Sequence, residues 1–213
     1  LPTPIDSAAL HVTGALAQSV GTVDGMLFDA FATEDGVEIV VVDPEGEGVE
    51  AAAVALHVRA TYRHRREDGV RVSPREELAA LGSAALRIPG ERPIAALLVR
   101  VRADGAIEGL ACGMDAPRVV AGEAVRALDA AEGAGAIEGV SGPTRSLVGA
   151  LAPGDALVIA ARRVDGDAVA AFVARSRGAE LAGRASDAAT WARGKSADVA
   201  EDDVLVVVAE RAA

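Results

Sequence analysis

The fold of this chain is decided by residues 37–66, VEIVVVDPEGEGVEAAAVALHVRATYRHRR. The stretch opens with a run of valine and isoleucine, and such β-branched residues favour a buried strand. The run stops at Asp43, and the sequence PEGEG that follows is typical of a tight turn. The alanine-rich segment after the turn predicts a helix from about 48 to 66, because alanine, leucine, glutamate and arginine are strong helix formers. A carboxylate therefore lies where a strand ends and a glycine turn opens a helix, which is a natural place for a metal or anion site.

The composition is that of an acidic, aliphatic protein. Hydrophobic residues make up 51% of the chain but aromatic residues only 2%, so the core must be built from alanine, valine and leucine. The length of 213 residues is enough for one medium-sized domain, which we place over residues 1–213. The net charge of −11 argues against nucleic acid and anionic membranes as partners, because an acidic surface repels phosphate groups.

The single cysteine and the lack of long apolar runs indicate the compartment. Cys112 alone excludes an internal disulfide and a zinc site with several cysteines, and it fits a reducing cytosol. No apolar run reaches the length of a transmembrane helix and no signal peptide is visible, so we expect a cytoplasmic protein. The chain begins with Leu1, which is compatible with a segment whose upstream domains are missing.

Groups of strands alternate with groups of helices along the rest of the chain. We expect strands at 8–18 and 26–32, and the turn Glu34-Asp35-Gly36 predicts that 26–32 pairs antiparallel with 37–42. Further strands are expected at 94–102, 106–112, 118–120, 156–161 and 205–210. The glycine-rich residues 131–146 show no clear pattern and are interpreted as a loop.

Three helical stretches complete the pattern. The helix at 48–66 has an apolar first part (Val49, Ala52, Ala53, Leu56) and a basic end (Arg59, Arg63, His64, Arg65, Arg66). We interpret the basic end as a favourable interaction with the helix dipole, in preference to a phosphate-binding patch. Ser73-Pro74-Arg75-Glu76 has the form of a helix N-terminus and predicts a second helix to about Arg87. A third is expected at 167–192, and the alternating groups of strands and helices favour an α+β fold.

Six short motifs follow one another along the chain. They are Gly25-Met26-Leu27-Phe28-Asp29-Ala30-Phe31, Val42-Asp43-Pro44-Glu45-Gly46-Glu47-Gly48, Ser73-Pro74, Cys112-Gly113-Met114 with Pro117, Pro153-Gly154-Asp155, and Asp202-Asp203-Val204-Leu205. In order and spacing they resemble the motifs of the metal-dependent PPM protein phosphatases, in the bacterial branch typified by the phosphatase domain of stage II sporulation protein E (SpoIIE). The resemblance covers the chain from about Val12 to Glu210.

The resemblance implies a fold and a chemistry. The fold is an α+β sandwich of two antiparallel β-sheets flanked by helices. In the family, carboxylates at strand ends hold two Mn²⁺ or Mg²⁺ ions, which activate a water for attack on phosphoserine or phosphothreonine. Asp43 then corresponds to the bridging metal ligand, and Asp202, with Asp203 beside it, to the last one. The implied partner is a phosphorylated regulator of the anti-anti-sigma type in sporulation or stress signalling, and a homodimer is left open.

Three positions depart from the family pattern. Met26 stands where the first motif has an aspartate, and Pro44 replaces a glycine whose carbonyl binds metal. Arg162 falls where the family has the aspartate of Thr-Asp-Gly. A thioether is too soft for Mg²⁺ or Mn²⁺, and a guanidinium repels a cation. We therefore hypothesise an eroded metal site that binds no metal cofactor, in which Arg162 pairs with Asp43 or Asp202 in place of the ions.

Two alternatives stay open. Asp165 or Asp24 could supply a missing ligand, and the chain would then be an active Mn²⁺- or Mg²⁺-dependent phosphatase that uses Asp43, Asp202 and Asp203. The second alternative is an α+β domain without phosphatase ancestry, in which Asp43 is an ordinary turn residue. Of the three, we favour a phosphatase-fold domain that is non-catalytic or weakly active and acts in phosphorylation-based bacterial regulation.

Overall fold

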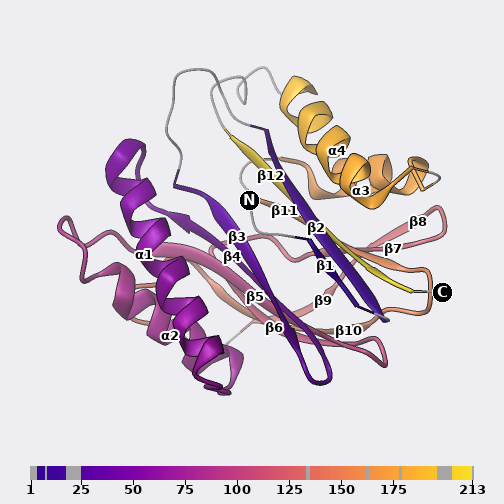
Figure 1. Cartoon of the computed structure of the whole chain (residues 1–213). Helices are drawn as coiled ribbons and strands as arrows, with labels where there is room; N and C mark the ends of the chain where they lie inside the picture. The colour runs from indigo at the N-terminus through magenta and orange to yellow at the C-terminus, as the bar shows by residue number, and fades with distance from the viewer. Residues whose placement is uncertain are drawn as a thin grey trace.

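The computed structural model describes residues 4–7, 9–17, 25–132, 135–161, 164–177, 179–195 and 203–212. Within these residues the chain forms two six-stranded antiparallel sheets that stack face to face, and two helices cover the outer face of each sheet (Figure 1). The α+β sandwich of two antiparallel sheets flanked by helices that the sequence predicts is therefore confirmed. No helix in this part of the chain is long and apolar enough to span a membrane.

Each sheet combines segments from distant parts of the sequence. The first sheet has the strand order β1 (Ile5–Asp6), β2 (Leu10–Ala17), β12 (Val204–Arg211), β11 (Ala156–Ala161), β7 (Arg118–Ala121) and β8 (Ala124–Ala127). The second has the order β3 (Leu27–Thr33), β4 (Gly36–Pro44), β5 (Ile94–Arg102), β6 (Ala106–Cys112), β10 (Thr144–Ala150) and β9 (Asp129–Glu132). The predicted hairpin of β3 and β4 is confirmed, with Thr33 opposite Gly36 across the turn.

The run of β-branched residues in β4 is explained by burial on both of its faces. Val37, Ile39 and Val41 point into the core between the two sheets. Val40 and Val42 point to the opposite side, into a second core beneath α1 (Gly48–Glu67) and α2 (Pro74–Ala85). Because a strand places successive side chains on opposite faces, a strand buried on both needs an unbroken apolar run.

The core between the sheets is tight enough to require a glycine. A Cβ on Gly14 of β2 would lie 2.5 Å from ring atoms of Phe28 on β3. Such a contact is shorter than van der Waals packing allows, so a side chain here would force the sheets apart. We infer that Gly14 allows Phe28 to fill the space between the sheets.

Helix α1 buries a different face from the one that its sequence suggests. Val49 and Leu56, which we expected in its apolar part, have exposed fractions of 74% and 64%. The buried residues are instead Ala51, Val54, Ala55, Val58, Tyr62 and Arg66. Alanines surround the first half of the helix, so the apolar pattern alone does not identify the covered face.

The start of α2 follows the prediction closely. Ser73 is the N-cap, and its hydroxyl accepts a hydrogen bond from the backbone amide of Glu76, while the Glu76 carboxylate accepts one from the backbone amide of Ser73. Pro74 occupies the first helical turn. This reciprocal pair satisfies two amides that would otherwise lack partners. The helix ends at Ala85, slightly before the expected Arg87.

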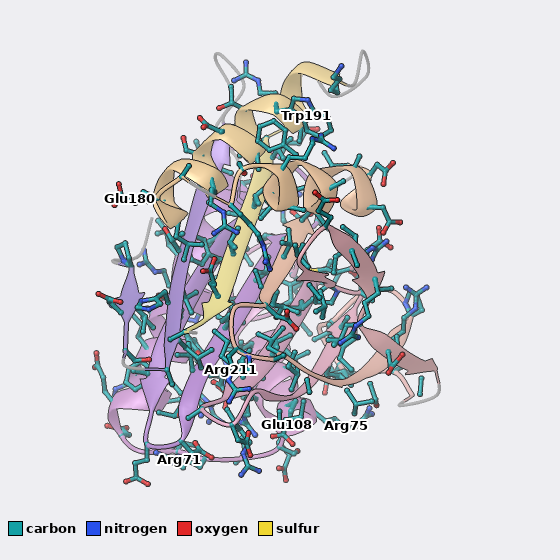
Figure 2. The ribbon with its side chains drawn as sticks, turned by 90° about the vertical axis from the view of Figure 1, so that its right-hand side faces the viewer. Arg71, Arg75, Glu108, Glu180, Trp191 and Arg211 are labelled. Atoms are coloured by element: carbon teal, nitrogen blue, oxygen red, sulfur yellow. The ribbon has the colours of Figure 1, made fainter. Side chains whose placement is uncertain are left out.

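Two expectations about the second half of the chain are wrong. Residues 131–146 are not all loop, because β9 extends to Glu132 and β10 begins at Thr144. The expected helix at 167–192 is two helices, α3 (Gly166–Arg175) and α4 (Leu181–Lys195), which pack on the outer face of the first sheet. Trp191 on α4 stacks on Phe172 of α3, with ring centroids 5.1 Å apart, and Figure 2 shows it in this helical layer.

Candidate functional site

The predicted motifs meet in a hollow at the ends of two strands. Asp43, near the end of β4, lines it together with Ala160 and Ala161 at the end of β11. The hollow has a volume of about 140 Å³, and its other walls are Ala95, Gly113, Met114 and Asp115. Because β4 and β11 belong to different sheets, the hollow lies where the two sheets meet. The second motif, the segment after Cys112 and the strand that precedes Arg162 are thus brought together.

Asp115 is a member of this hollow that our sequence analysis did not single out. It follows Met114, in the segment that connects β6 to β7, and its side chain is exposed, whereas that of Asp43 is half-buried. The sequence feature that could have identified Asp115 as a site residue is its position between Cys112 and Pro117, within one of the six motifs. An aspartate two residues after the motif glycine Gly113 is a candidate ligand, because hard cations bind carboxylate oxygens.

Three predicted site residues lie away from open solvent. Met26 has an exposed fraction of 4% and belongs to the core between the sheets. Pro44 is buried at the end of β4, where it lies opposite Ile94 of β5. Asp203 is buried directly before β12. Asp24, Asp202 and Arg162 lie outside the described residues, so the pairing of Arg162 with Asp43 or Asp202 stays a prediction.

Asp165, one of the two candidate replacement ligands, is the N-cap of α3. Its Oδ1 accepts hydrogen bonds from the backbone amides of Asp167, at 3.0 Å, and Ala168, at 3.2 Å. It lines another hollow, together with Trp191 and Lys195, and not the one that contains Asp43. The Asp-Gly pair at 165–166 therefore has a local structural role, because an N-cap aspartate satisfies the first amides of a helix.

The donor set around Asp43 can be compared with what two metal ions need. Mn²⁺ and Mg²⁺ each require several oxygen ligands in fixed geometry. Among the described residues, no group of three or more histidine, cysteine, aspartate or glutamate side chains is arranged to hold a metal ion. The hollow offers the carboxylates of Asp43 and Asp115, and the Met26 position contributes only a core thioether. The two carboxylates that the described residues bring to the hollow supply fewer oxygen ligands than two ions need.

The first motif keeps one aspartate, Asp29, which has a structural partner. Its side chain is fully buried and accepts hydrogen bonds from Arg59 Nε, at 2.9 Å, and Arg63 Nη2, at 2.8 Å. Burial alone would raise the pKa of Asp29, but the hydrogen bonds from Arg63 and Arg59 outweigh it and hold the pKa below its usual value. Asp29 thus attaches β3 to α1.

The basic end of α1 contacts two further buried carboxylates, and we define Glu38 and Glu77 with Arg65, Arg66 and Arg100 as the buried carboxylate network. Arg65 donates two hydrogen bonds to Glu77, at 3.0 and 3.1 Å, and Arg66 pairs with both Glu77 and Glu38. Arg100 Nε donates to Glu38 at 2.7 Å. The basic end of α1 therefore neutralises buried carboxylates, a role that our dipole interpretation missed.

We predict that Asp29 makes the protein sensitive to acid. A carboxylate with a lowered folded-state pKa contributes stability above its unfolded-state pKa, and this contribution is lost as the pH falls through the folded-state value. In Asp29→Asn, the urea midpoint should be lower than in wild type at pH 7, and this deficit should shrink as the pH falls below about 4. A constant deficit from pH 7 to pH 2.5 would contradict the assignment. Asp104→Asn, at an exposed turn, is the matched control.

No protein-family model and no curated protein matches this chain. Solved structures do match. The RsbU and RsbW domains of Rv1364c from Mycobacterium tuberculosis align with a TM-score of 0.77 and 24% identity over 96% of this chain. The structure of the PP2C phosphatase domain of SpoIIE from Bacillus subtilis aligns with a TM-score of 0.67 and 14% identity over 99% of this chain. The catalytic domain of the serine/threonine phosphatase PstP, solved with two manganese ions, aligns with a TM-score of 0.67 and 13% identity over 96% of this chain.

The chain has the fold of the PPM-type phosphatases. The resemblance that we drew from the six motifs is thereby confirmed at the level of fold. The chain spans 60% of the matched Rv1364c structure, 64% of the SpoIIE structure and 99% of PstP. The fold places Asp43 and Ala161 in one hollow. At identities of 24% or lower, the matched structures show the fold alone.

Proposed function

We propose that this chain is a single PPM-fold domain, located in the cytoplasm, that recognises a phosphorylated regulatory protein and is non-catalytic or weakly active. The observation that carries the proposal is the composition of the strand-end hollow. It retains Asp43 at the end of β4, while the Met26 position lies in the core and the described residues supply no donor set for metal. A phosphatase fold with an eroded metal site would favour binding over turnover.

The class of partner is proposed from the matched structures. One of them contains an RsbU and an RsbW domain, and another is described as part of the bacterial stressosome, a modular system adapted to control secondary messenger signalling. By analogy, we propose a phosphorylated regulator of the anti-anti-sigma type as the partner of this domain. Ala161 lines the hollow and Arg162 is the next residue in the sequence, so we propose Arg162 as the cation that takes over the electrostatic role of the metal ions.

Manganese binding tests the proposal. We expect wild-type protein to show no micromolar Mn²⁺ binding by calorimetry and no Mn²⁺-dependent hydrolysis of p-nitrophenyl phosphate. Arg162→Asp introduces a carboxylate directly after Ala161 in the sequence, so it should bind Mn²⁺ at least about tenfold more tightly than wild type, because a repelling charge becomes a ligand. Arg163→Asp makes the same charge change one residue later and is the matched control. If both variants gain affinity equally, the special position of Arg162 is refuted.

One observation favours the active phosphatase as a second candidate. Asp115 adds an exposed carboxylate to the hollow of Asp43, so a metal site could combine them with Asp202 and Asp203. Manganese-dependent hydrolysis by wild type that Asp43→Asn and Asp115→Asn both abolish would establish this function. Of the candidate replacements, Asp24 is outside the described residues and Asp165 is engaged as the N-cap of α3.

A further inference from the structure

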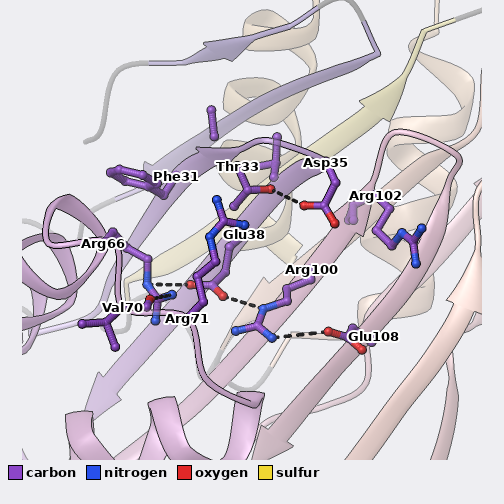
Figure 3. A pocket seen from close by; sticks show the side chains of 14 residues that line it. Phe31, Thr33, Asp35, Glu38, Arg66, Val70, Arg71, Arg100, Arg102 and Glu108 are labelled. Atoms are coloured by element: carbon purple, nitrogen blue, oxygen red, sulfur yellow. Dashed lines mark hydrogen bonds and ion pairs between the residues drawn. The ribbon is translucent and has the colours of Figure 1, made fainter.

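A second hollow lies at the hairpin end of β4, opposite the end that carries Asp43. Figure 3 shows it beside the loop that joins α1 to α2. Its volume is about 230 Å³. We call it the arginine pocket. Its side chains fall into a charged floor (Glu38, Arg66, Arg100), an apolar wall (Phe31, Val70) and a rim (Thr33, Asp35, Arg71, Arg102, Glu108).

The floor is a fixed, preorganised surface. The Arg66 side chain has an exposed fraction of 5%, pairs through Nε with Glu38 at 3.1 Å, and donates from Nη1 to the carbonyl of Val70 at 2.7 Å. Arg100 donates to Glu38, to the carbonyl of Val72 and to Glu108, at 2.7, 2.6 and 3.3 Å. These interactions hold the loop against the sheet, so the pocket has a defined shape without a ligand.

The two rim arginines are held much less firmly. The side chains of Arg71 and Arg102 have exposed fractions of 57% and 56%. Their ion pairs, with Glu34 at 3.9 Å and Asp104 at 3.4 Å, involve exposed carboxylates. Exposed ion pairs of this kind contribute little stability and are readily exchanged. Arg71 and Arg102 can therefore turn to a ligand at little cost.

The charge of the lining selects the ligand. Four arginines and three carboxylates line the pocket, and Arg71 and Arg102 pair with the exposed carboxylates of Glu34 and Asp104 just outside it. A ligand with one negative charge can take the place of these exposed partners, whereas a phosphate dianion would bring a second negative charge next to Asp35 and Glu108 at the rim. Guanidinium groups bind carboxylates with matched geometry. Phe31 and Val70 offer an apolar surface to the rest of the ligand.

We propose that the arginine pocket binds a carboxylate attached to an apolar group, with Arg71 and Arg102 as its cationic contacts. The ligand is a free organic acid or an acidic residue beside an apolar one in a protein segment; the chemistry of recognition is the same. The proposal does not depend on the function of the Asp43 hollow, because the two sites lie at opposite ends of β4.

Phenylacetate is the probe that tests the pocket, and phenylacetamide is its neutral match. In amide-resolved NMR titrations of the whole chain, phenylacetate should shift the signals of Gly69 and Val70 in a saturable way, and phenylacetamide should not. Arg71→Ala and Arg102→Ala should each weaken phenylacetate binding at least about fivefold, because each removes a charge-assisted hydrogen bond. Both side chains are exposed, so both variants should keep the urea midpoint of the wild-type protein. If either variant has a lower midpoint, the binding test is repeated with Arg71→Gln.

Matched controls separate this site from others. Arg87→Ala, at an exposed position after α2, and Asp43→Asn, in the other hollow, should leave phenylacetate binding unchanged. Acetyl-Phe-Glu-amide distinguishes the two sources: binding at least tenfold tighter than that of phenylacetate identifies a protein segment, and weaker or equal binding identifies a free acid. The proposal is overturned if phenylacetamide binds equally, if both arginine variants bind like wild type, or if the shifts map to residues 113–115.

Discussion

Arg66→Met should lower the free energy of unfolding by about 3–5 kcal/mol, the usual cost of removing one partner from a buried ion pair. Arg66 lies between two carboxylates, Glu38 and Glu77, and both are buried. Without Arg66, Arg65 still binds Glu77 and Arg100 still binds Glu38, but both buried carboxylates lose an ion pair at once and the carbonyl of Val70 loses its donor. Urea unfolding followed by circular dichroism measures the change.

Arg59→Met is the matched control for this experiment. It removes one arginine from the same helix, but Asp29 keeps two contacts with Arg63, so the loss should be at most about 2 kcal/mol. If both methionine variants lose the same stability, burial of Arg66 is not what makes the network important. A double-mutant cycle of Arg66→Met with Glu77→Gln then measures their coupling directly.

Met26→Asp, which introduces the aspartate that the family resemblance implies at this position, should destabilise the protein by about 3–5 kcal/mol and should not be rescued by Mn²⁺. Met26 lies in the core between the two sheets, where a carboxyl group loses packing and solvent at once. In this setting the introduced carboxyl takes up a proton, so the folded state binds more protons than the unfolded one. The deficit in the free energy of unfolding should therefore be smaller at pH 4 than at pH 7.

Two control variants separate the effect of the buried charge from the effects of altered packing and of a charge on the surface. Met26→Leu keeps the apolar volume and should cost less than about 1.5 kcal/mol. Ala32→Asp places the same charge at an exposed position of β3 and should change stability by at most about 0.5 kcal/mol. Recovery of wild-type stability by Met26→Asp in millimolar Mn²⁺ would show that a metal site can be rebuilt by one substitution, which contradicts an eroded centre.

The elements with strong local signals were predictable from the sequence. β4, β5 and β12 are rich in β-branched residues and were placed within one or two residues of their observed ends. β10 was not predicted, because Arg145 and Ser146 on one side and Gly149 and Ala150 on the other limit its apolar run to Leu147 and Val148. It forms through pairing with β6, where Thr144 lies opposite Cys112 and Ala150 opposite Ala106. Strands of this kind depend on a partner distant in the sequence.

The site residues also divide into those with a local sequence signal, which could be predicted, and those that depend on distant partners, which could not. Asp43 stood out because it ends an apolar run before a glycine turn. Glu38 looked like an ordinary polar residue of the same strand, and only its contacts with Arg66 and Arg100 show that it is buried. Asp165 looked like a metal ligand because Asp-Gly is part of the family motif, yet the same two residues also start α3. Side-chain partners far apart in the chain decide such cases.

The sparse aromatic content has a practical consequence for following this protein in solution. The chain has one tryptophan and one tyrosine. Trp191 stacks on Phe172 in the layer of α3 and α4, while Tyr62 is buried in α1, with the guanidinium of Arg66 5.4 Å from the centre of its ring. Each outer layer thus has its own natural chromophore. Tryptophan fluorescence reports on one side of the sandwich and tyrosine absorbance on the other, so the order in which the two layers melt can be observed without attaching any label.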